Sequence, residues 1–318
     1  MALTRARFVG PLALSMLTGT ALIGGIPWRS ATAQEAPAGE EGPVVLIVAA
    51  HPDDEAMFAG SIYKITHSLG GVVDLALVTD GSGGYRYAYL AEPIYGLELT
   101  DEQVAREYLP TIRKRELMEA GAILGIRNYF FLDAYDNAYT ENVDSVLSQV
   151  WDAKALRSDL AKIMRRGSYD FVFAHLTVPA FHAHHVAATI LALEAAGSLP
   201  GERPVVLGSF IADSEDPSRF DYADYSGLEG YPVTRVRDDV EPFVFDRKQP
   251  LREDGRLDYR ILVNWVIAEH KTQGTMQLLM NTGDTERFWY FEINDPGKLA
   301  RTRELFERLA EAGQDPIQ

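Results

Sequence analysis

The 318-residue sequence contains no cysteine. This absence excludes disulfide bonds, thiolate metal ligands and a cysteine nucleophile, so the fold must be held together by packing alone. Basic residues are also scarce, because 30 lysines and arginines stand against 46 aspartates and glutamates, a formal net charge of -16 at pH 7. Such a negative surface repels nucleic acid and anionic lipid, and we expect neither as a partner.

No hydrophobic run after residue 26 is long enough to span a membrane. The N-terminus resembles a secretory signal. Arg5 and Arg7 precede an apolar stretch over residues 8–26, and Ala31-Thr32-Ala33 forms a small-x-small cleavage site. An uncleaved membrane anchor is the alternative, because the stretch approaches spanning length. Pro11 and four glycines within the stretch weaken that alternative.

These features predict three parts: a signal peptide at residues 1–33, a linker at 34–42 rich in Ala, Gly, Pro and Glu, and one functional domain at 43–318. Cleavage would remove three arginines and no acid, which moves the net charge from -16 to -19. We therefore expect a secreted or periplasmic protein with no membrane contact after cleavage. No sequence feature specifies an oligomeric state.

Apolar strand-like runs alternate with helical patterns along the domain, without internal repeats. This alternation predicts an α/β fold, a Rossmann-like three-layer sandwich with a mostly parallel sheet. The glycines of Gly81-Ser82-Gly83-Gly84 lack the full dinucleotide-binding spacing, so we expect no nucleotide cofactor. We expect strands near residues 43–50, 72–79, 128–132, 169–174 and 204–210, and helices near 55–69, 104–125, 154–166, 184–197, 258–272 and 297–312.

The first expected strand runs into His51-Pro52-Asp53-Asp54-Glu55. Seven apolar residues in a row are typical of a strand buried on both faces, and ligands of open α/β sheets bind at the carboxyl ends of such strands. Asp53 or Asp54 alone would be interpreted as a helix N-cap. One cap needs one carboxylate, however, whereas three acids beside a histidine repel one another unless a cation or a catalytic task holds them together. The cluster therefore indicates a metal site.

A second cluster, His182-Ala183-His184-His185, follows the strand expected at 169–174. It holds three of the seven histidines of the chain. His182 and His185 are one helical turn apart, so both can face one point. With His51 and Asp54 they supply a set of histidines and a carboxylate that leaves an open position, which is typical of a catalytic zinc site.

With these motifs, the chain resembles the LmbE-like, or phosphatidylinositol-glycan class L (PIG-L), family of N-acetylglucosaminyl deacetylases. That family has the motifs Ala-His-Pro-Asp-Asp-Glu and His-x-x-His. Further agreement is found in Val78-Thr79-Asp80-Gly81, Arg115-Glu116, Leu124-Gly125, Phe131-Leu132 before Asp136, and His270-Lys271-Thr272-Gln273.

The resemblance implies zinc ligands at His51, Asp54 and His185, a general base at Asp53, and an oxyanion-stabilising histidine at His182. The chain departs from the family at His184, where an aspartate commonly orients the first histidine of the motif. The anionic partner that would keep His182 charged is therefore absent.

These roles suit amide hydrolysis, which needs a polarised carbonyl and an activated water. An aspartate beside the metal ligands can take the proton of that water and return it to the leaving amine. Zinc is the expected metal, although Fe²⁺, Co²⁺ and Mn²⁺ accept the same ligand types.

Six further residues are candidates for substrate binding. Asp80 ends a strand, and Tyr85 opens a tyrosine-rich loop whose rings would either stack on sugar or pack on their own domain. The others have ordinary alternatives as ion pairs or packed side chains. The six are Asp80, Tyr85, Arg115, Asp136, His184 and His270. A second aromatic and acidic segment at 212–255 is expected to be a lid or rim, or simply surface packing.

Three functions remain open at this point. The favoured one is an exported, metal-dependent N-deacetylase acting on an N-acetylated amino sugar in a glycan, glycolipid or glycoconjugate. A non-catalytic sugar-binding module is the second, although binding alone needs no base at Asp53. The third is an Fe(II) oxygenase with two histidines and a carboxylate as a facial triad.

Overall fold

A seven-stranded sheet forms the centre of the protein in the computed structural model, which describes residues 42–213, 222, 224–252 and 255–311. Five neighbouring strands run parallel to one another, and the sixth strand in spatial order is antiparallel to both of its neighbours. In spatial order the strands are β3 (Ile126–Ala134), β2 (Val72–Thr79), β1 (Val44–Ala49), β4 (Phe171–His175), β5 (Val205–Ala212), β7 (Thr285–Tyr290) and β6 (Phe243–Asp246).

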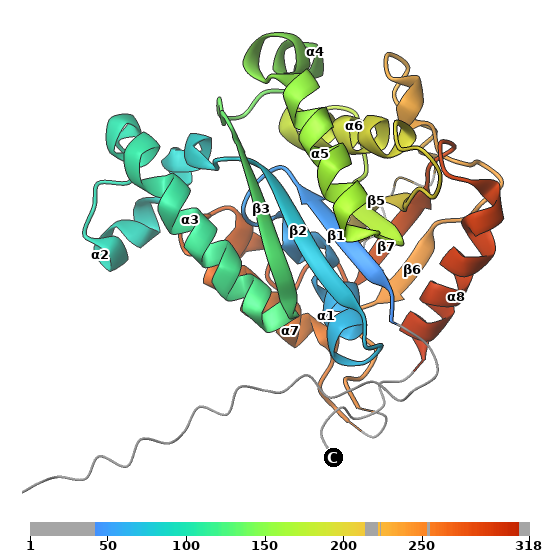
Figure 1. Ribbon diagram of the computed structural model, residues 1–318. Coiled ribbons are helices and arrows are strands. Elements are labelled where there is room, and N and C mark those ends of the chain that lie inside the picture. Colours follow the sequence, from blue (N-terminus) through green and yellow to red (C-terminus); the bar gives the residue numbers. More distant parts are fainter. Residues whose placement is uncertain (1–41, 214–221, 223, 253–254, 312–318) are drawn as a thin grey trace, which may run out of the picture. The chain divides into compact units, whose positions relative to one another are not determined.

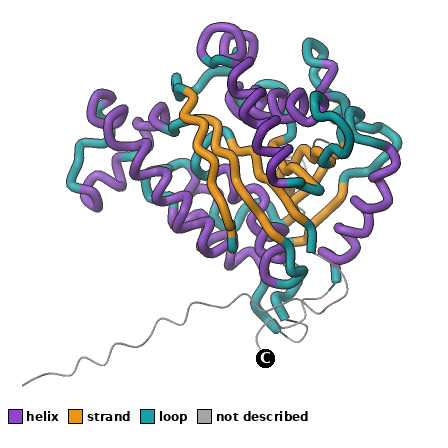
Figure 2. Tube along the Cα trace, viewed as in Figure 1, coloured by secondary structure: helices purple, strands orange, loops and turns teal. Residues whose placement is uncertain are grey.

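Helices cover both faces of the sheet (Figure 1; Figure 2). α5 and α6 pack on each other on one face, and α1 packs with α3, α7 and α8 on the other. The helices are α1 (Ala59–His67), α2 (Glu92–Tyr95), α3 (Glu102–Leu124), α4 (Val143–Ser145), α5 (Ala153–Gly167), α6 (Ala183–Gly197), α7 (Tyr259–Glu269) and α8 (Leu299–Ala310). None of the helices in the described part is long and apolar enough to span a bilayer.

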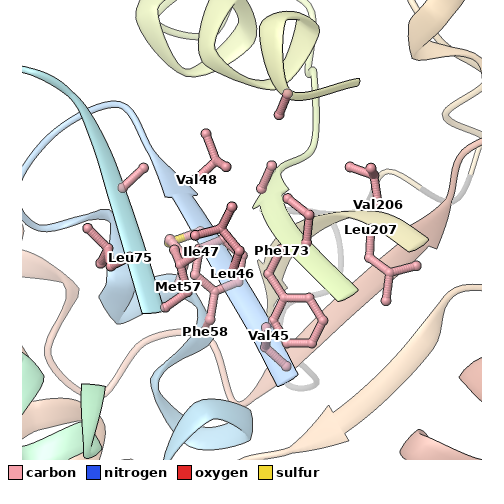
Figure 3. Packing of buried hydrophobic residues seen from close by; sticks show 14 of the residues in the cluster. Val45, Leu46, Ile47, Val48, Met57, Phe58, Leu75, Phe173, Val206 and Leu207 are labelled. Atoms are coloured by element: carbon pink, nitrogen blue, oxygen red, sulfur yellow. The ribbon is translucent and has the colours of Figure 1, made fainter. Parts of the chain in front are cut away.

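The central strand β1 is apolar because helices bury both of its faces. Figure 3 shows β1 between Leu75 of β2 and Phe173 of β4, with Met57 and Phe58 of the following 3-10 turn packed against it. All the side chains from Val45 to Ala49 are inaccessible or nearly so. This rigid strand fixes the position of the residues that follow it.

The expected α/β fold with a mostly parallel, helix-flanked sheet is confirmed, and the five expected strands all occur. One helix differs from the prediction, because the expected segment 55–69 divides into a 3-10 helix, Asp54–Phe58, and α1. The signal peptide expected at residues 1–33 lies outside the described residues, as does nearly all of the linker expected at 34–42.

The expectation for residues 212–255 was wrong in part, because this segment contributes β6 to the sheet. Phe245 is buried, and Phe243 stacks on Phe306 of α8 with ring centroids 4.9 Å apart. The expected strands also omitted β7, where a buried Glu286 interrupts the apolar pattern. Residues 214–221, 223 and 253–254 of the expected rim lie outside the described part.

Candidate metal centre

The two histidine motifs meet at the carboxyl ends of β1 and β4, which are parallel neighbours. From β1, the sheet continues through β2 on one side and through β4 on the other. Ligand sites of open α/β sheets lie at such a switch point, because the loops diverge there and leave a crevice. His51 follows β1, and His182 caps the N-terminus of α6, the helix after β4.

His51, Asp54 and His185 converge on one point. Nδ1 of His51 lies 2.9 Å from Nε2 of His185, and that nitrogen lies 3.2 Å from Oδ1 of Asp54. Two atoms that each bind one ion at about 2 Å lie no more than about 4 Å apart, so both separations suit a shared ion. The donor set, two imidazole nitrogens and one carboxylate oxygen, is also the type that zinc prefers.

A second group of possible ligands shares His51 with the first and adds His182 and His184. It consists of histidines only, whereas the first group brings a carboxylate that offsets part of the charge of a divalent ion. Burial and the neighbouring His185 hold the pKa of His51 well below its usual range, so its ring is neutral as a ligand must be.

The three acids after β1 have separate environments. Oδ2 of Asp54 accepts hydrogen bonds from the backbone N–H groups of Ala50 and His51, at 2.6 and 2.9 Å, which leaves Oδ1 directed at His185. Asp53 precedes the 3-10 helix but makes no side-chain cap hydrogen bond. Burial, followed by repulsion from Asp54, raises the pKa of the Asp53 carboxyl to about 7. Capping therefore does not explain this carboxylate.

Glu55 is fully buried and is not among the residues that converge on the metal centre. It contacts Nε2 of His270, and neither side chain has exposed surface. Burial lowers the pKa of His270, but the attraction and hydrogen bond of Glu55, together with the charges of Asp53 and Glu116, outweigh burial and the net pKa is raised. His270 was expected to contact substrate; its complete burial assigns it instead to holding the turn after α7 against the first motif.

His182 is presented by the first turn of α6. Its Nδ1 accepts a hydrogen bond from the backbone N–H of His184 at 3.3 Å, so a neutral ring carries its proton on Nε2. Burial, with the nearby His184 and His185, lowers the pKa of His182 to about 3. The ring is thus a neutral donor, in line with the missing anionic partner.

His184 and Asp136 lie behind the metal centre. His184 is inaccessible to solvent, and its Nδ1 is 3.0 Å from Nε2 of His51 and 3.6 Å from Oδ1 of Asp136. Asp136 is also buried and accepts a hydrogen bond from the backbone N–H of Ala138 at 3.0 Å. Both were expected to bind substrate, but neither faces solvent.

The remaining substrate-binding candidates are spread out. Asp80 accepts hydrogen bonds from the backbone N–H and the hydroxyl of Ser82 in the turn after β2, at 2.9 and 2.8 Å. Tyr85 packs on a small apolar cluster against α3, and its hydroxyl donates to Glu102 at 3.2 Å, which favours the packing interpretation. Arg115 is exposed on α3, whereas Arg113 turns inward.

Sequence reasoning missed three residues near the centre. Arg113 is buried and donates to the carbonyl oxygens of Gly84 and Thr272, at 3.0 and 3.1 Å, and its charge acts on Asp53. His175 ends β4 and stacks on His185, with ring centroids 4.5 Å apart. Tyr139 lies edge-on to His182 at 5.0 Å and is 64% exposed. Of these three residues, only His175 could have been found from the sequence, because it is a histidine at the end of an apolar strand.

Comparison with protein families gives a match over residues 46–196 to the family described as PIG-L: GlcNAc-PI de-N-acetylase. This range contains both histidine motifs, most of β1 and all of β2, β3 and β4. No curated protein matches the chain.

Several solved structures are similar. A deacetylase of teicoplanin biosynthesis has a TM-score of 0.51 at 16% identity, over 79% of this chain and 100% of that one. GalB, the 4-carboxy-2-hydroxymuconate hydratase of Pseudomonas putida KT2440, has a TM-score of 0.50 at 17% identity, over 78% and 95%. Since one is a deacetylase and the other a hydratase, they establish the fold and leave the reaction to be argued from the site. From the family match, the part of this chain that carries both histidine motifs, residues 46–196, belongs to the PIG-L, or LmbE-like, deacetylase family.

Proposed function

We propose that this protein is a metal-dependent N-deacetylase that hydrolyses the acetamide of an N-acetylated amino sugar. The observation that carries the proposal is the convergence of His51, Asp54 and His185 beside a carboxylate, Asp53, whose pKa is raised to about 7. A base whose pKa lies near the working pH is partly deprotonated and so is able to accept a proton. It also binds that proton strongly enough to take it from water. A purely structural metal site would need no such neighbour.

His51, Asp54 and His185 would hold the metal, with zinc as our first choice. When bound, a divalent ion of this kind polarises a carbonyl and acidifies water. Asp53 takes the proton from the attacking water and returns it to the leaving amine. The N–H at Nε2 of His182 donates to the oxygen that becomes negative as the carbonyl is attacked, because its Nδ1 is already used as an acceptor.

The substrate class rests on the family and on the rim of the site. The matching family is described by de-N-acetylation of GlcNAc-PI, an N-acetylated amino sugar. Tyr139 offers an exposed ring beside His182, and sugar rings stack on such apolar faces. We infer that the amino sugar lies with its acetamide at the metal centre and its ring near Tyr139.

Export remains part of the proposal on the strength of the first 33 residues. They combine two arginines, an apolar stretch and a small-x-small site in the order of a secretory signal. The absence of cysteine is compatible with an oxidising compartment.

Acetate release from a panel of N-acetylated sugars and glycoconjugates, with metal analysis of the same protein, tests the proposal. We expect stoichiometric divalent metal and acetate release that chelation abolishes. Saturable sugar binding without acetate release would support the binding-module alternative. Oxygen consumption by the Fe²⁺ form, or addition of water to an unsaturated acid without acetate release, would replace the deacetylase by an oxygenase or a hydratase.

A further inference from the structure

Behind the proposed ligand His51 is a chain of two hydrogen-bonding side chains that the proposed mechanism does not use. Nε2 of His51 lies 3.0 Å from Nδ1 of His184, and Nε2 of His184 lies 2.6 Å from Oδ1 of Asn137. The His184 ring has no exposed surface, so water does not replace either partner.

We propose that Asn137 and His184 fix the tautomer of His51, so that its Nδ1 is the nitrogen offered to the metal. This inference rests on the proposed metal centre but not on the proposed substrate. It makes Asn137 and His184 positioning residues, because they act on the metal through His51.

The direction of the hydrogen bonds follows from the chemistry of each group. The Oδ1 atom of Asn137 only accepts, so the proton of a neutral His184 ring is on Nε2. Nδ1 of His184 then has no proton and accepts one from Nε2 of His51. Nδ1 of His51 is consequently bare, and this is the atom that lies 2.9 Å from Nε2 of His185. A histidine binds metal through a nitrogen that carries no proton.

Asp136 is the other acceptor near the His184 ring, and it could redirect the chain. Its Oδ1 lies 3.6 Å from Nδ1 of His184, which is beyond hydrogen-bond distance. The same oxygen accepts from the backbone N–H of Ala138. His51 is therefore the closer partner of His184 Nδ1.

The loop that carries Asn137 is tied to the helix that carries His184. The backbone N–H of Ala183, the first residue of α6, donates to the carbonyl oxygen of Thr140 at 2.7 Å. Ala138 has a left-handed φ of 68°, a conformation that a residue with a side chain adopts only at a cost in energy. The strained turn and the anchoring bond together hold the Asn137 amide against the His184 ring.

The proposal also explains the departure from the family motif. An aspartate at position 184 is too short to occupy the place of the imidazole and connect Asn137 with His51 at once. Here the His184 side chain serves His51, whereas His182 is bonded by the backbone N–H of the same residue. A histidine at position 184 therefore fits this chain, because its two ring nitrogens bond His51 and Asn137 at once.

Metal affinity tests the proposal directly. The purified full-length protein, without its metal, is titrated with Zn²⁺ or Co²⁺ against a competing chelator. Asn137→Leu removes the acceptor at similar size and should raise the metal dissociation constant about 10- to 100-fold, the usual effect of losing a partner of a metal-binding histidine. Asn137→Asp keeps an acceptor and should remain close to wild type. His184→Phe should weaken binding as Asn137→Leu does.

Asn264→Leu is the matched control, because this half-buried asparagine of α7 bonds Asn281 and not a residue of either motif, and its loss should leave metal affinity unchanged. Thermal unfolding of the metal-free variants checks that each is folded, and the visible spectrum of the Co²⁺ forms reports the ligand set. Wild-type affinity in Asn137→Leu, or equal loss in Asn137→Asp and Asn137→Leu, would overturn the proposal. A changed Co²⁺ spectrum and loss of stoichiometric binding in His184→Phe alone would make His184 a ligand, which also overturns it. None of these readouts needs a substrate, so failure of the deacetylase proposal would be recognised separately.

Discussion

The carboxylate of Glu55 contacts Nε2 of His270, and both side chains are fully enclosed by the protein. The pair joins residues 215 positions apart, the end of the first motif and the turn after α7. Its other two polar atoms, Oε2 of Glu55 and Nδ1 of His270, have no hydrogen-bond partner among the described residues. This single contact therefore offsets the cost of burying both polar side chains. Removing one of them leaves the other buried without a partner.

Glu55→Gln should lower the free energy of unfolding of the metal-free protein by about 2–4 kcal/mol at pH 6, because a buried charged hydrogen bond is lost. The folded protein raises the pKa of His270, so this stability is complete below the ordinary histidine pKa of about 6.5 and is lost as pH rises through the raised value. Urea unfolding between pH 5 and 9 measures both effects.

Glu102→Gln is the control, since Glu102 forms an exposed pair with Arg106. It should cost no more than about 1 kcal/mol at any of these pH values. A difference between wild type and Glu55→Gln that grows with rising pH would contradict the assigned charge state of His270.

The two neighbouring aspartates should separate cleanly. Asp54→Ala should lose metal and activity together, and also some stability, because two backbone N–H groups lose their acceptor. Asp53→Asn should keep near-stoichiometric metal and reduce turnover at least about 100-fold, the scale of a positioned acid–base group. Metal quantification and steady-state rates decide. Retained turnover in Asp53→Asn, or loss of its metal, would mean that another residue is the base.

Tyr139→Ala should raise KM for the N-acetylated sugar about two- to tenfold and change kcat little, because stacking on an exposed ring is modest and is made by ground state and transition state alike. Tyr139→Phe should behave as wild type. Tyr89→Ala, which removes another exposed tyrosine, is the matched control. An equal rise in KM for Tyr89→Ala would mean that the loss of any exposed tyrosine has this effect and that Tyr139 has no specific role in sugar binding.

Expression with the native N-terminus should yield an exported protein that begins near Gln34, because cleavage is expected after Ala31-Thr32-Ala33. N-terminal sequencing of the exported fraction checks this. Recovery of the intact chain in the membrane fraction would replace the signal peptide by an anchor.

Much of the fold was readable from local patterns. The apolar run before His51 and the alternation of strands with helices predict the parallel half of the sheet, because burial on both faces demands continuous apolar residues. The antiparallel half was not readable. Glu286 is buried in β7 because Arg247 pairs with it at 2.9 Å and the backbone N–H groups of Gly60 and Ser61 donate to its carboxylate. These partners are supplied from distant segments of the chain.

The site divides in the same way. Motif spacing and the family resemblance brought forward His51, Asp53, Asp54, His182 and His185. Their convergence was predictable because the carboxyl ends of parallel strands lie at one edge of the sheet, even for residues as far apart in sequence as His51 and His185. The placement of Asn137 and His184 behind His51, and of Glu55 against His270, depends on loops and helices that meet only in the folded chain. The local sequence determines which functional group a position carries and in which helix, strand or loop it lies. Its hydrogen-bond partner, and hence its protonation and role, is decided by the tertiary contacts that exclude water around it.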